Sequence, residues 1–255
     1  MARIFVTGSS SGLGFLAGQE LLRQGHEVVL HARDTGKAAT TRAAAPAAQI
    51  VTGDVATIAG ARAVAEAAAA LGPFDAVIHN VAIGYTERSR AQTEDGLPAV
   101  FATNTLAPYI LTALLPQPQR LVYMSSGMHR GARANLDDLD WTRRGWSGSS
   151  AYAESKLHDA MLAFAVARLW PDVLSNAVDP GWVPTRMGGR GAPDNLDEGY
   201  LTQAWLALGD DADARVTGRY FYHRQPRPAN PEASDVALQE RLLARCAELS
   251  GIALP

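Results

Sequence analysis

A tyrosine and a lysine one helical turn apart are the residues of this sequence best suited to proton chemistry. Tyr152 and Lys156 open a segment, 151–170, in which apolar residues recur at helical spacing. Positions i and i+4 share one face of a helix, so both side chains point to one place. An ammonium beside a phenol lowers the pKa of the phenol from its ordinary value of about 10. Such a phenol can give a proton to a carbonyl oxygen or take one from an alcohol. Two residues on a solvated helix face would look the same, so the rest of the chain must decide.

A glycine-rich turn near the N-terminus offers a place for a phosphate group. The apolar run Ile4–Thr7 predicts a buried strand, and a helix-like segment ends near Gln24. Between them, residues 7–14 read Thr-Gly-Ser-Ser-Ser-Gly-Leu-Gly. Such a turn lets the backbone approach a pyrophosphate, while the helix N-terminus supplies free N–H groups. A flexible Gly/Ser turn is the plain alternative. The predicted cofactor contacts here are Gly8, Ser10, Ser11, Gly12, Leu13 and Gly14.

The end of the strand predicted over 28–33 bears on the choice of dinucleotide. An acidic residue there binds the ribose hydroxyls of NAD(H), whereas a nearby arginine accommodates the 2′-phosphate of NADP(H). Ala32 stands where the acid is expected and Arg33 follows it. A guanidinium suits phosphate because it offers a planar fork of donors. Asp34 keeps the alternative open, because it becomes the sugar-binding acid if the strand ends later. The sequence favours NADP(H) over NAD(H).

Further polar residues follow the strands predicted over 49–52, 76–80 and 120–124. Asp54 can accept from an adenine amino group or cap the next helix. Asn104 lies in an apolar stretch of a helix predicted over 96–115, where a buried amide needs partners. Ser126 follows the strand over 120–124. Asp54 is the cofactor contact predicted after the third strand.

Strands and helices alternate along the chain, which defines the fold class. With strands over 174–178 and 218–222, this order indicates βαβ units and a parallel sheet. Right-handed crossovers place the strand C-termini on one edge, where a ligand binds. We expect an α/β, single-domain Rossmann fold over residues 1–255. Its doubly wound, mostly parallel seven-stranded sheet would be covered by helices on both faces.

Composition argues against several classes of function. The 255 residues carry a net charge of −3, which gives no basic field for nucleic acid or anionic lipid. The single cysteine, Cys246, fits a reducing compartment. No apolar run reaches the roughly 20 residues of a membrane span, and the first strand leaves no room for a signal peptide. No residues are spaced to make a metal site with His79. We expect a cytoplasmic protein without nucleic-acid, membrane or metal partners.

Together these motifs resemble the short-chain dehydrogenase/reductase family, in its classical single-domain type, over nearly the whole chain. The glycine turn has the family's three residues between its first two glycines. Asn104, Ser126, Tyr152 and Lys156 stand in the order of its catalytic tetrad. Residues 180–185 match its motif over the nicotinamide. The resemblance implies further cofactor contacts from Val55, Asn80, Val81, Ala82, Tyr152, Lys156, Pro180, Gly181, Val183 and Thr185.

Two departures distinguish this chain from the family pattern. Residues 79–82 read His-Asn-Val-Ala where Asn-Asn-Ala-Gly is usual, which would tighten or shift the wall beside a ribose. The stretch 127–150 separates Ser126 from Tyr152 more widely than is typical. With segments 93–97 and 135–139, this stretch is similar to the retinol-dehydrogenase-like branch.

The resemblance implies hydride transfer between a nicotinamide and a carbonyl carbon, with the protein handling the proton. Tyr152 would protonate the developing alkoxide, and Ser126 would hydrogen-bond the same oxygen. Lys156 would hold the nicotinamide ribose and bias Tyr152 toward ionisation, and Asn104 would keep a water behind Lys156. Family members pair through the helices that carry Asn104 and Tyr152, which implies a homodimer or homotetramer.

Substrate contacts are expected from two loops, about 127–150 and 182–197. Aromatic and methionine side chains suggest a bulky apolar or aromatic ketone or aldehyde, although the tryptophans also fit a role in packing the loops. Residues 188–191 indicate a mobile lid. The predicted substrate contacts are Tyr85, Met128, Trp146, Trp182 and Met187. Two other functions stay open: an NADP-binding regulatory or sensor protein, and a sugar-nucleotide epimerase or dehydratase.

Overall fold

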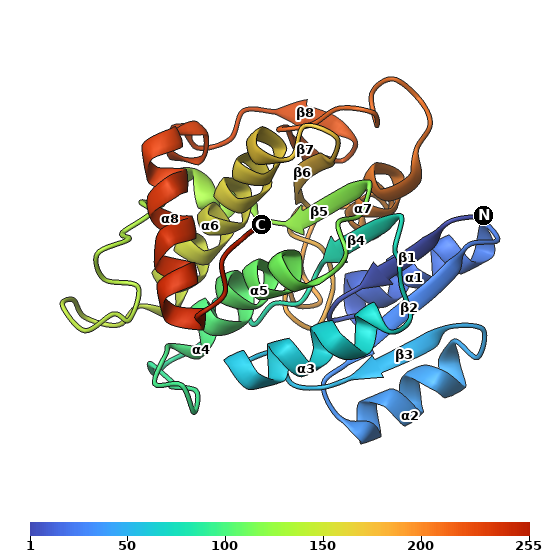
Figure 1. The fold of residues 1–255 in the computed structure, drawn as a ribbon, viewed down its shortest axis with the longest axis horizontal. Helices are drawn as coiled ribbons and strands as arrows, with labels where there is room; N and C mark the ends of the chain where they lie inside the picture. Colours follow the sequence, from blue (N-terminus) through green and yellow to red (C-terminus); the bar gives the residue numbers. More distant parts are fainter.

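The computed structural model describes residues 1–255 and is built on one eight-stranded sheet (Figure 1). The strand order is β3-β2-β1-β4-β5-β6-β7-β8, and β1 to β7 run parallel. This order reverses between β1 and β4, the point at which such sheets bind ligands. The strands are β1 (Arg3–Val6), β2 (Glu27–Ala32), β3 (Gln49–Thr52), β4 (Ala76–His79), β5 (Arg120–Met124), β6 (Leu174–Asp179), β7 (Tyr220–Tyr222) and β8 (Gln225–Arg227). The expected α/β Rossmann fold is confirmed.

The prediction of seven strands was wrong by one, because the segment after β7 folds back as a hairpin. β8 pairs antiparallel with β7, with Tyr222 opposite Gln225. His223 and Arg224 form the two-residue turn with φ of 49° and 59°. Positive φ at both central positions suits a tight hairpin, but neither residue belongs to the types that signal one. Pro226 lies in the edge strand, where its missing N–H costs no ladder bond.

Helices cover both faces of the sheet. Alternate residues of each strand enter two separate cores, since Phe5 packs with α3, α5 and α6 whereas Ile4 and Val6 pack with α1 and α7. In Figure 1, α3, α5 and α6 lie on the side of the sheet toward the viewer. The helices are α1 (Gly12–Arg23), α2 (Thr35–Ala44), α3 (Ile58–Ala69), α4 (Ala99–Phe101), α5 (Ala107–Leu114), α6 (Gly148–Leu169), α7 (Leu196–Leu208) and α8 (Val236–Ser250).

The helix that carries Asn104 is interrupted rather than continuous. It begins at Ala99 and changes to a π-helix over Ala102–Leu106 before α5. An α-helix would bond the carbonyl of Asn104 to the N–H of residue 108, but Pro108 has none. The sequence thus fixes the position of the interruption, although we expected one helix over 96–115.

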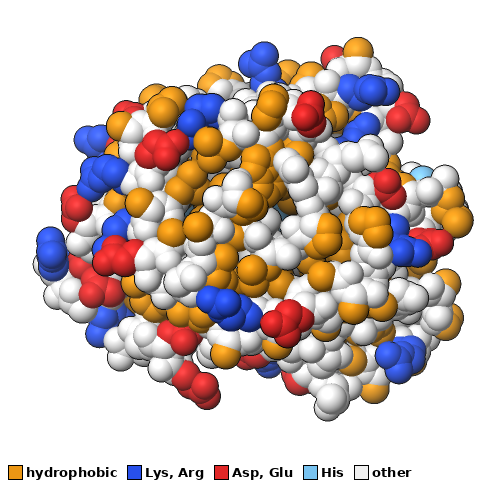
Figure 2. Space-filling model, viewed as in Figure 1, with side chains coloured by type: hydrophobic (Ala, Val, Ile, Leu, Met, Phe, Trp, Pro, Cys, Tyr) orange, Lys and Arg blue, Asp and Glu red, His pale blue; other side chains and the backbone are white.

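The C-terminal residues lie across α5 and α6. α8 runs beside α6 in Figure 1. Beyond it, the hydroxyl of Tyr109 on α5 donates to the carbonyl of Ile252 at 2.8 Å, and the indole of Trp170 donates to Pro255 at 2.9 Å. Figure 2 shows hydrophobic side chains toward the middle of this face and charges of both signs around its rim. None of the helices is both long enough and apolar enough to cross a membrane.

Candidate active site

The glycine-rich turn fits a group that approaches its backbone closely. Gly8 has a φ of 60°, and a Cβ there would lie 2.6 Å from the Cα of Val81. A Cβ on Gly14 would lie 2.3 Å from Nδ2 of Asn80. Both positions therefore require glycine. Ser11, the N-cap residue of α1, makes no side-chain cap, so the first N–H groups of the helix face outward for a phosphate.

His31 on β2, which the sequence did not mark as a site residue, hydrogen-bonds to the backbone of this turn. The N–H of Gly8 donates to Nδ1 of His31 at 3.0 Å, and Nε2 lies 2.8 Å from the carbonyl of Gly53. Nδ1 must therefore be the acceptor and Nε2 the donor, which requires the neutral ring. Burial lowers the pKa of His31 and keeps the ring in that form. Its position within a buried strand gave no sign of this contact.

Of the charged residues after β2 and β3, Asp34 caps a helix, whereas Arg33 and Asp54 are exposed to solvent. Asp34 is the N-cap of α2, and its carboxylate accepts from the N–H of Lys37 at 2.8 Å. Arg33 lies 3.7 Å from the other oxygen of Asp34, and its side chain is 68% exposed. Asp54 also faces solvent, but it bonds to the N–H of Ala56, and Thr57 caps α3 instead. Arg33 is thus exposed and only loosely paired with Asp34, which leaves its guanidinium able to meet an anionic group.

Residues after β4 brace the glycine turn. The amide of Asn80 donates to the carbonyls of Thr7 and Gly8, both at 3.1 Å. The N–H groups of Asn80 and Val81 bond to the hydroxyl of Thr7. The backbone of Val81 lies directly against Gly8, so the ends of β1 and β4 meet closely at this point. Ala82 continues the same wall, whereas Val55, on the loop after β3, is buried.

Tyr152 and Lys156 lie together near the start of α6, as their spacing predicted. Nζ of Lys156 is 5.7 Å from the centre of the Tyr152 ring, and both side chains are buried. The expectation of a lowered phenol pKa was wrong. Burial, which penalises the phenolate, raises the pKa of Tyr152, and the opposing effects of Lys156 and Ser126 do not cancel it. Spacing along a helix predicted the pair but not the burial.

Ser126 faces this phenol from the end of β5 and is held by a buried histidine. Nε2 of His129 accepts from the N–H of Asn230 at 3.0 Å. Nδ1 must then carry the proton, and it lies 2.7 Å from the carbonyl of Ser126. The amide of Asn230 also donates to the carbonyls of His129 and Ala132. His129 and Asn230 therefore hold the backbone of Ser126 in place.

Asn104 is fully buried and joins the loop after β4 to α6. Its oxygen accepts from the N–H of Ile83 at 2.9 Å. Its nitrogen donates to the carbonyl of Ile83 at 3.1 Å and to the hydroxyl of Ser155 at 3.0 Å. The side chain makes no hydrogen bond to Lys156. The amide thus aligns the wall of the site beside Tyr152, and its expected water remains a prediction.

The predicted substrate residues fall into two groups. Tyr85 meets the ring of Tyr152 edge-on with centroids 5.7 Å apart, and its hydroxyl donates to the carbonyl of Met187 at 3.2 Å. Met128, Met187 and Trp182 are exposed, by 39%, 38% and 56%. Trp146 instead packs against Trp141, and its indole donates to the carbonyl of Glu87 at 2.9 Å. Tyr85 thus lies against Tyr152 and bonds to Met187, which precedes the lid residues, whereas Trp146 ties two loops together.

The nicotinamide motif after β6 forms the base of the lid. Gly181 has a φ of 84°, and its N–H bonds to the carboxylate of Asp179. Val183 is buried, and Thr185 accepts from the N–H of Gly188 at 3.2 Å. The carbonyl of Pro180 lies 3.3 Å from Nε2 of His223 in the β7–β8 turn. These contacts hold the base of the lid at the C-terminal ends of β6 and β7.

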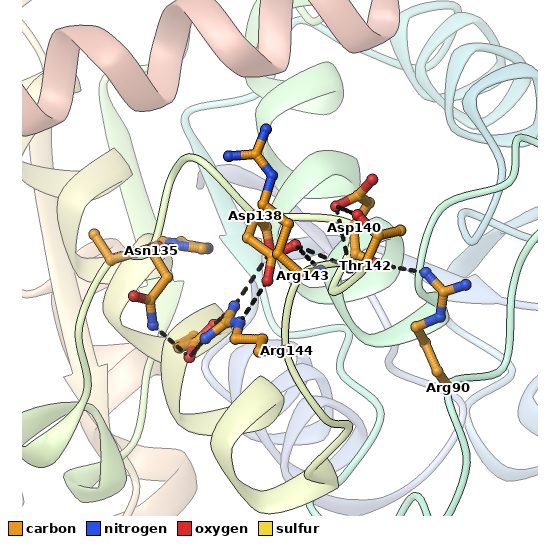
Figure 3. A network of polar contacts seen from close by, with 10 residues as sticks. Arg90, Asn135, Asp138, Asp140, Thr142, Arg143 and Arg144 are labelled. Carbon is orange, nitrogen blue, oxygen red and sulfur yellow. Dashed lines mark hydrogen bonds and ion pairs between the residues drawn. The ribbon is translucent and has the colours of Figure 1, made fainter.

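The loop between β5 and α6 is tied to the catalytic helix by one arginine (Figure 3). Arg144 donates to the carboxylate of Asp138 at 2.9 Å and to that of Glu154 at 2.7 Å. Its guanidinium also lies 3.7 Å from the centre of the Trp141 ring. Asn135 donates to Glu154 at 2.7 Å. Glu154 stands between Tyr152 and Lys156 in the sequence, so this network joins the loop directly to the catalytic segment.

Comparison with known proteins places the chain in a family. The family model for short chain dehydrogenase matches residues 2–195. An uncharacterized oxidoreductase of Emericella nidulans is 45% identical over 260 residues, which cover 100% of this chain and 99% of the relative. A Streptomyces protein assigned as a daunorubicin C-13 ketoreductase is 32% identical over 94% of this chain and 89% of its own. The chain belongs to the short-chain dehydrogenase/reductase family.

Further comparisons agree with the retinol-dehydrogenase-like branch and with the Rossmann fold. Human retinol dehydrogenase 13 is 26% identical over 99% of this chain and 85% of its own, as expected for the retinol-dehydrogenase-like branch. A crystal structure of an uncharacterized Mycobacterium paratuberculosis protein has a TM-score of 0.87 at 26% identity, covering 100% of this chain and 95% of the other. NADPH-bound carbonyl reductase from chicken fatty liver has a TM-score of 0.67 at 20% identity, covering 90% and 99%.

Proposed function

We propose that this chain is an NADP(H)-dependent oxidoreductase that interconverts a bulky, apolar or aromatic ketone or aldehyde and its alcohol. The observation that carries the proposal is the buried Tyr152, with Lys156 on its own helix and Ser126 facing it. Membership in an oxidoreductase family supports the class of reaction. A purely regulatory NADP-binding protein would have no need of this assembled set of side chains.

The chain's own residues would handle the proton. Nicotinamide, when bound, supplies or accepts the hydride. Because burial keeps Tyr152 protonated near neutral pH, its phenol serves as the acid that gives a proton to the carbonyl oxygen. The hydroxyl of Ser126 donates to the same oxygen and stabilises the charge that develops there. Lys156 has one N–H left after its bonds to Met124 and Asp159, and this donor suits a ribose hydroxyl.

The preference for NADP(H) rests on the two residues that follow Ala32. Asp34 already caps α2, so its carboxylate has less capacity for ribose hydroxyls. The exposed guanidinium of Arg33 is placed to meet a 2′-phosphate. Solved structures of the same fold include a carbonyl reductase with NADPH bound. These observations favour the phosphorylated cofactor.

The proposed substrate class follows from Tyr85, which contacts Tyr152, and from the exposed side chains on the segment to which Tyr85 bonds. Tyr85, Met187 and Trp182 present aromatic and thioether surface, which suits a flat apolar compound. The Streptomyces relative is assigned to reduction of a ketone on daunorubicin. We infer an aryl ketone or a similar carbonyl compound. A sugar-nucleotide epimerase or dehydratase fits less well, because such chains resemble a longer form with a substrate domain.

Location and assembly stay predictions of the sequence. We expect a cytoplasmic protein that acts on small molecules and forms a homodimer or homotetramer. The helices through which pairing was expected already carry α8 and the C-terminal residues, so any pairing surface there includes those segments.

The direct test is a search for turnover with purified protein. NADPH or NADH is mixed with a panel of aryl ketones, quinones and aldehydes, and the loss of reduced-cofactor absorbance is followed. We expect turnover of at least one aromatic carbonyl compound and preference for NADPH. Calorimetry with each cofactor serves as the second readout. Absence of binding for both cofactors would overturn the proposal.

A further inference from the structure

The ammonium of Lys156 has a buried partner that the proposed reaction does not use. Nζ donates to the carbonyl of Met124 at 2.7 Å and to Oδ2 of Asp159 at 2.8 Å. Lys156 and Asp159 are each only 2% exposed. An ammonium has three N–H donors, so these two bonds leave one. Together, Asp159 and Met124 fix both the place of the ammonium and the direction of its remaining N–H.

Asp159 carries a charge that opposes that of Lys156. Its only hydrogen bond is the one from Lys156, and Tyr123 on β5 and Tyr152 on α6 are the other titratable groups close enough to interact with it. Burial raises the pKa of Asp159 to about 7, although Lys156 opposes the rise. The carboxyl is therefore ionised across the alkaline range in which a tyrosine titrates. A cationic Lys156 and this carboxylate, 2.8 Å apart, together form a nearly neutral pair, so Tyr152 experiences only part of the lysine's charge.

We propose that Asp159 is a positioning residue of this site, which holds Lys156 toward the cofactor ribose and offsets its charge at Tyr152. The inference rests on the proposed oxidoreductase function. Because the Asp159 carboxylate reduces the effect of the Lys156 charge, Tyr152 stays in the phenol form, which donates a proton in carbonyl reduction. Without Asp159, the unopposed ammonium would favour the phenolate, which takes a proton from an alcohol. Asp159 thereby extends carbonyl reduction to higher pH.

Groups on neighbouring elements also act on Tyr152, and they stay in place when Asp159 is changed. Burial has the largest effect on the pKa of Tyr152 and raises it. Lys156 and Ser126 lower this pKa, whereas Asp159 and Asp179 raise it. The titratable groups that face Tyr152 are Lys156 and Asp159 on α6, Asp179 on β6, Tyr220 on β7 and Tyr85 on the loop after β4. Replacement of Asp159 alone therefore isolates one contribution.

The test replaces the Asp159 carboxylate by two uncharged side chains. Asp159→Asn keeps an oxygen acceptor for Lys156, and Asp159→Ser is the second variant. The phenolate of Tyr152 is titrated by ultraviolet difference between each protein and its Tyr152→Phe derivative, without substrate. We expect the pKa of Tyr152 to fall by about one unit in both variants, because removal of an anion favours the phenolate. Glu154→Gln, which removes a buried acid of the same helix that does not touch Lys156, should leave this pKa unchanged.

Kinetics supply the second readout. Alcohol oxidation below the pKa of Tyr152 should become about tenfold faster in Asp159→Asn, and the high-pH limit of ketone reduction should move down by about one unit. NADPH affinity should stay within about threefold, since the acceptor for Lys156 is kept. An unshifted titration would overturn the inference even if the wild-type enzyme turns over. A shifted titration in a protein without turnover would sustain the charge coupling and overturn the oxidoreductase proposal instead. Failure of both variants to fold would make Asp159 purely structural and also overturn the inference.

Discussion

Replacement of Arg144 by methionine should loosen the loop that leads into the catalytic helix. The guanidinium is the only cation bonded to the carboxylates of Asp138 and Glu154, which are 8% and 7% exposed. Burial raises the pKa of Glu154, and its bonds with Arg144 oppose that rise. Arg144→Met keeps much of the apolar stem but leaves both acids without their partner. The variant thus measures how firmly the loop is attached to α6.

The size of the effect follows from burial. Loss of one partner of a buried ion pair costs roughly 3–5 kcal/mol. Arg144 itself is 27% exposed, so solvent screening reduces this to about 2–3 kcal/mol. For 255 residues, an unfolding entropy of about 2.1 cal/mol/K per residue amounts to about 0.5 kcal/mol/K. The melting temperature should therefore fall by about 4–6 °C.

Scanning calorimetry and urea unfolding of the wild type and three variants test this expectation. Arg143→Met is the matched control, because Arg143 is exposed and contributes only its backbone N–H to Asp138. It should change the free energy of unfolding by less than about 0.5 kcal/mol. Addition of Glu154→Gln to Arg144→Met should restore about 1–2 kcal/mol, since it removes one unpaired charge. If Arg144→Met is no less stable than Arg143→Met, the attachment of the loop does not depend on this arginine.

Two further predictions concern acid stability and cofactor choice. Burial lowers the pKa of His79 to about 3, so the unfolded chain takes up a proton below about pH 6.5 while the folded chain does not. The neutral His79 therefore contributes to stability above pH 6.5, and this contribution is lost as the pH falls. In urea unfolding, the free energy of unfolding of wild type should fall by about 3 kcal/mol more than that of His79→Leu between pH 7 and pH 4. Parallel pH curves for the two proteins would contradict this. Arg33→Ala should weaken NADPH binding by about tenfold or more in calorimetry and change NADH binding little, because only the phosphorylated cofactor offers the guanidinium a partner. Equal losses for both cofactors would instead favour a general role for Arg33 in adenosine binding.

The sequence was sufficient for the fold and for the identity of the central pair. Strand and helix periodicity predicted seven of the eight strands, because buried parallel strands leave apolar runs that are easy to recognise. The hairpin at His223 and Arg224 was missed, since a turn of two non-glycine residues with positive φ carries no familiar signature. The i, i+4 spacing placed Tyr152 and Lys156 together on one helix.

The electrostatic state of the site could not be predicted in the same way. The burial that raises the pKa of Tyr152 depends on contacts with distant segments, such as the loop that holds Tyr85. Asp159 lies three residues after Lys156, a spacing that could have indicated the ion pair. His31 bonds to residues 23 and 22 positions away, and Arg144 bonds to residues 6 and 10 positions away through an irregular loop, so no helix or strand spacing marks either one.

The central claim is that Tyr152 moves the proton, and one substitution tests it most directly. Tyr152→Phe removes only the hydroxyl, and its turnover of an aromatic ketone that the wild-type enzyme reduces is measured beside calorimetric NADPH binding. We predict that kcat/KM falls at least about 100-fold while the Kd for NADPH stays within about threefold. Turnover within tenfold of wild type, with NADPH bound, would contradict the assignment of Tyr152 as the proton donor.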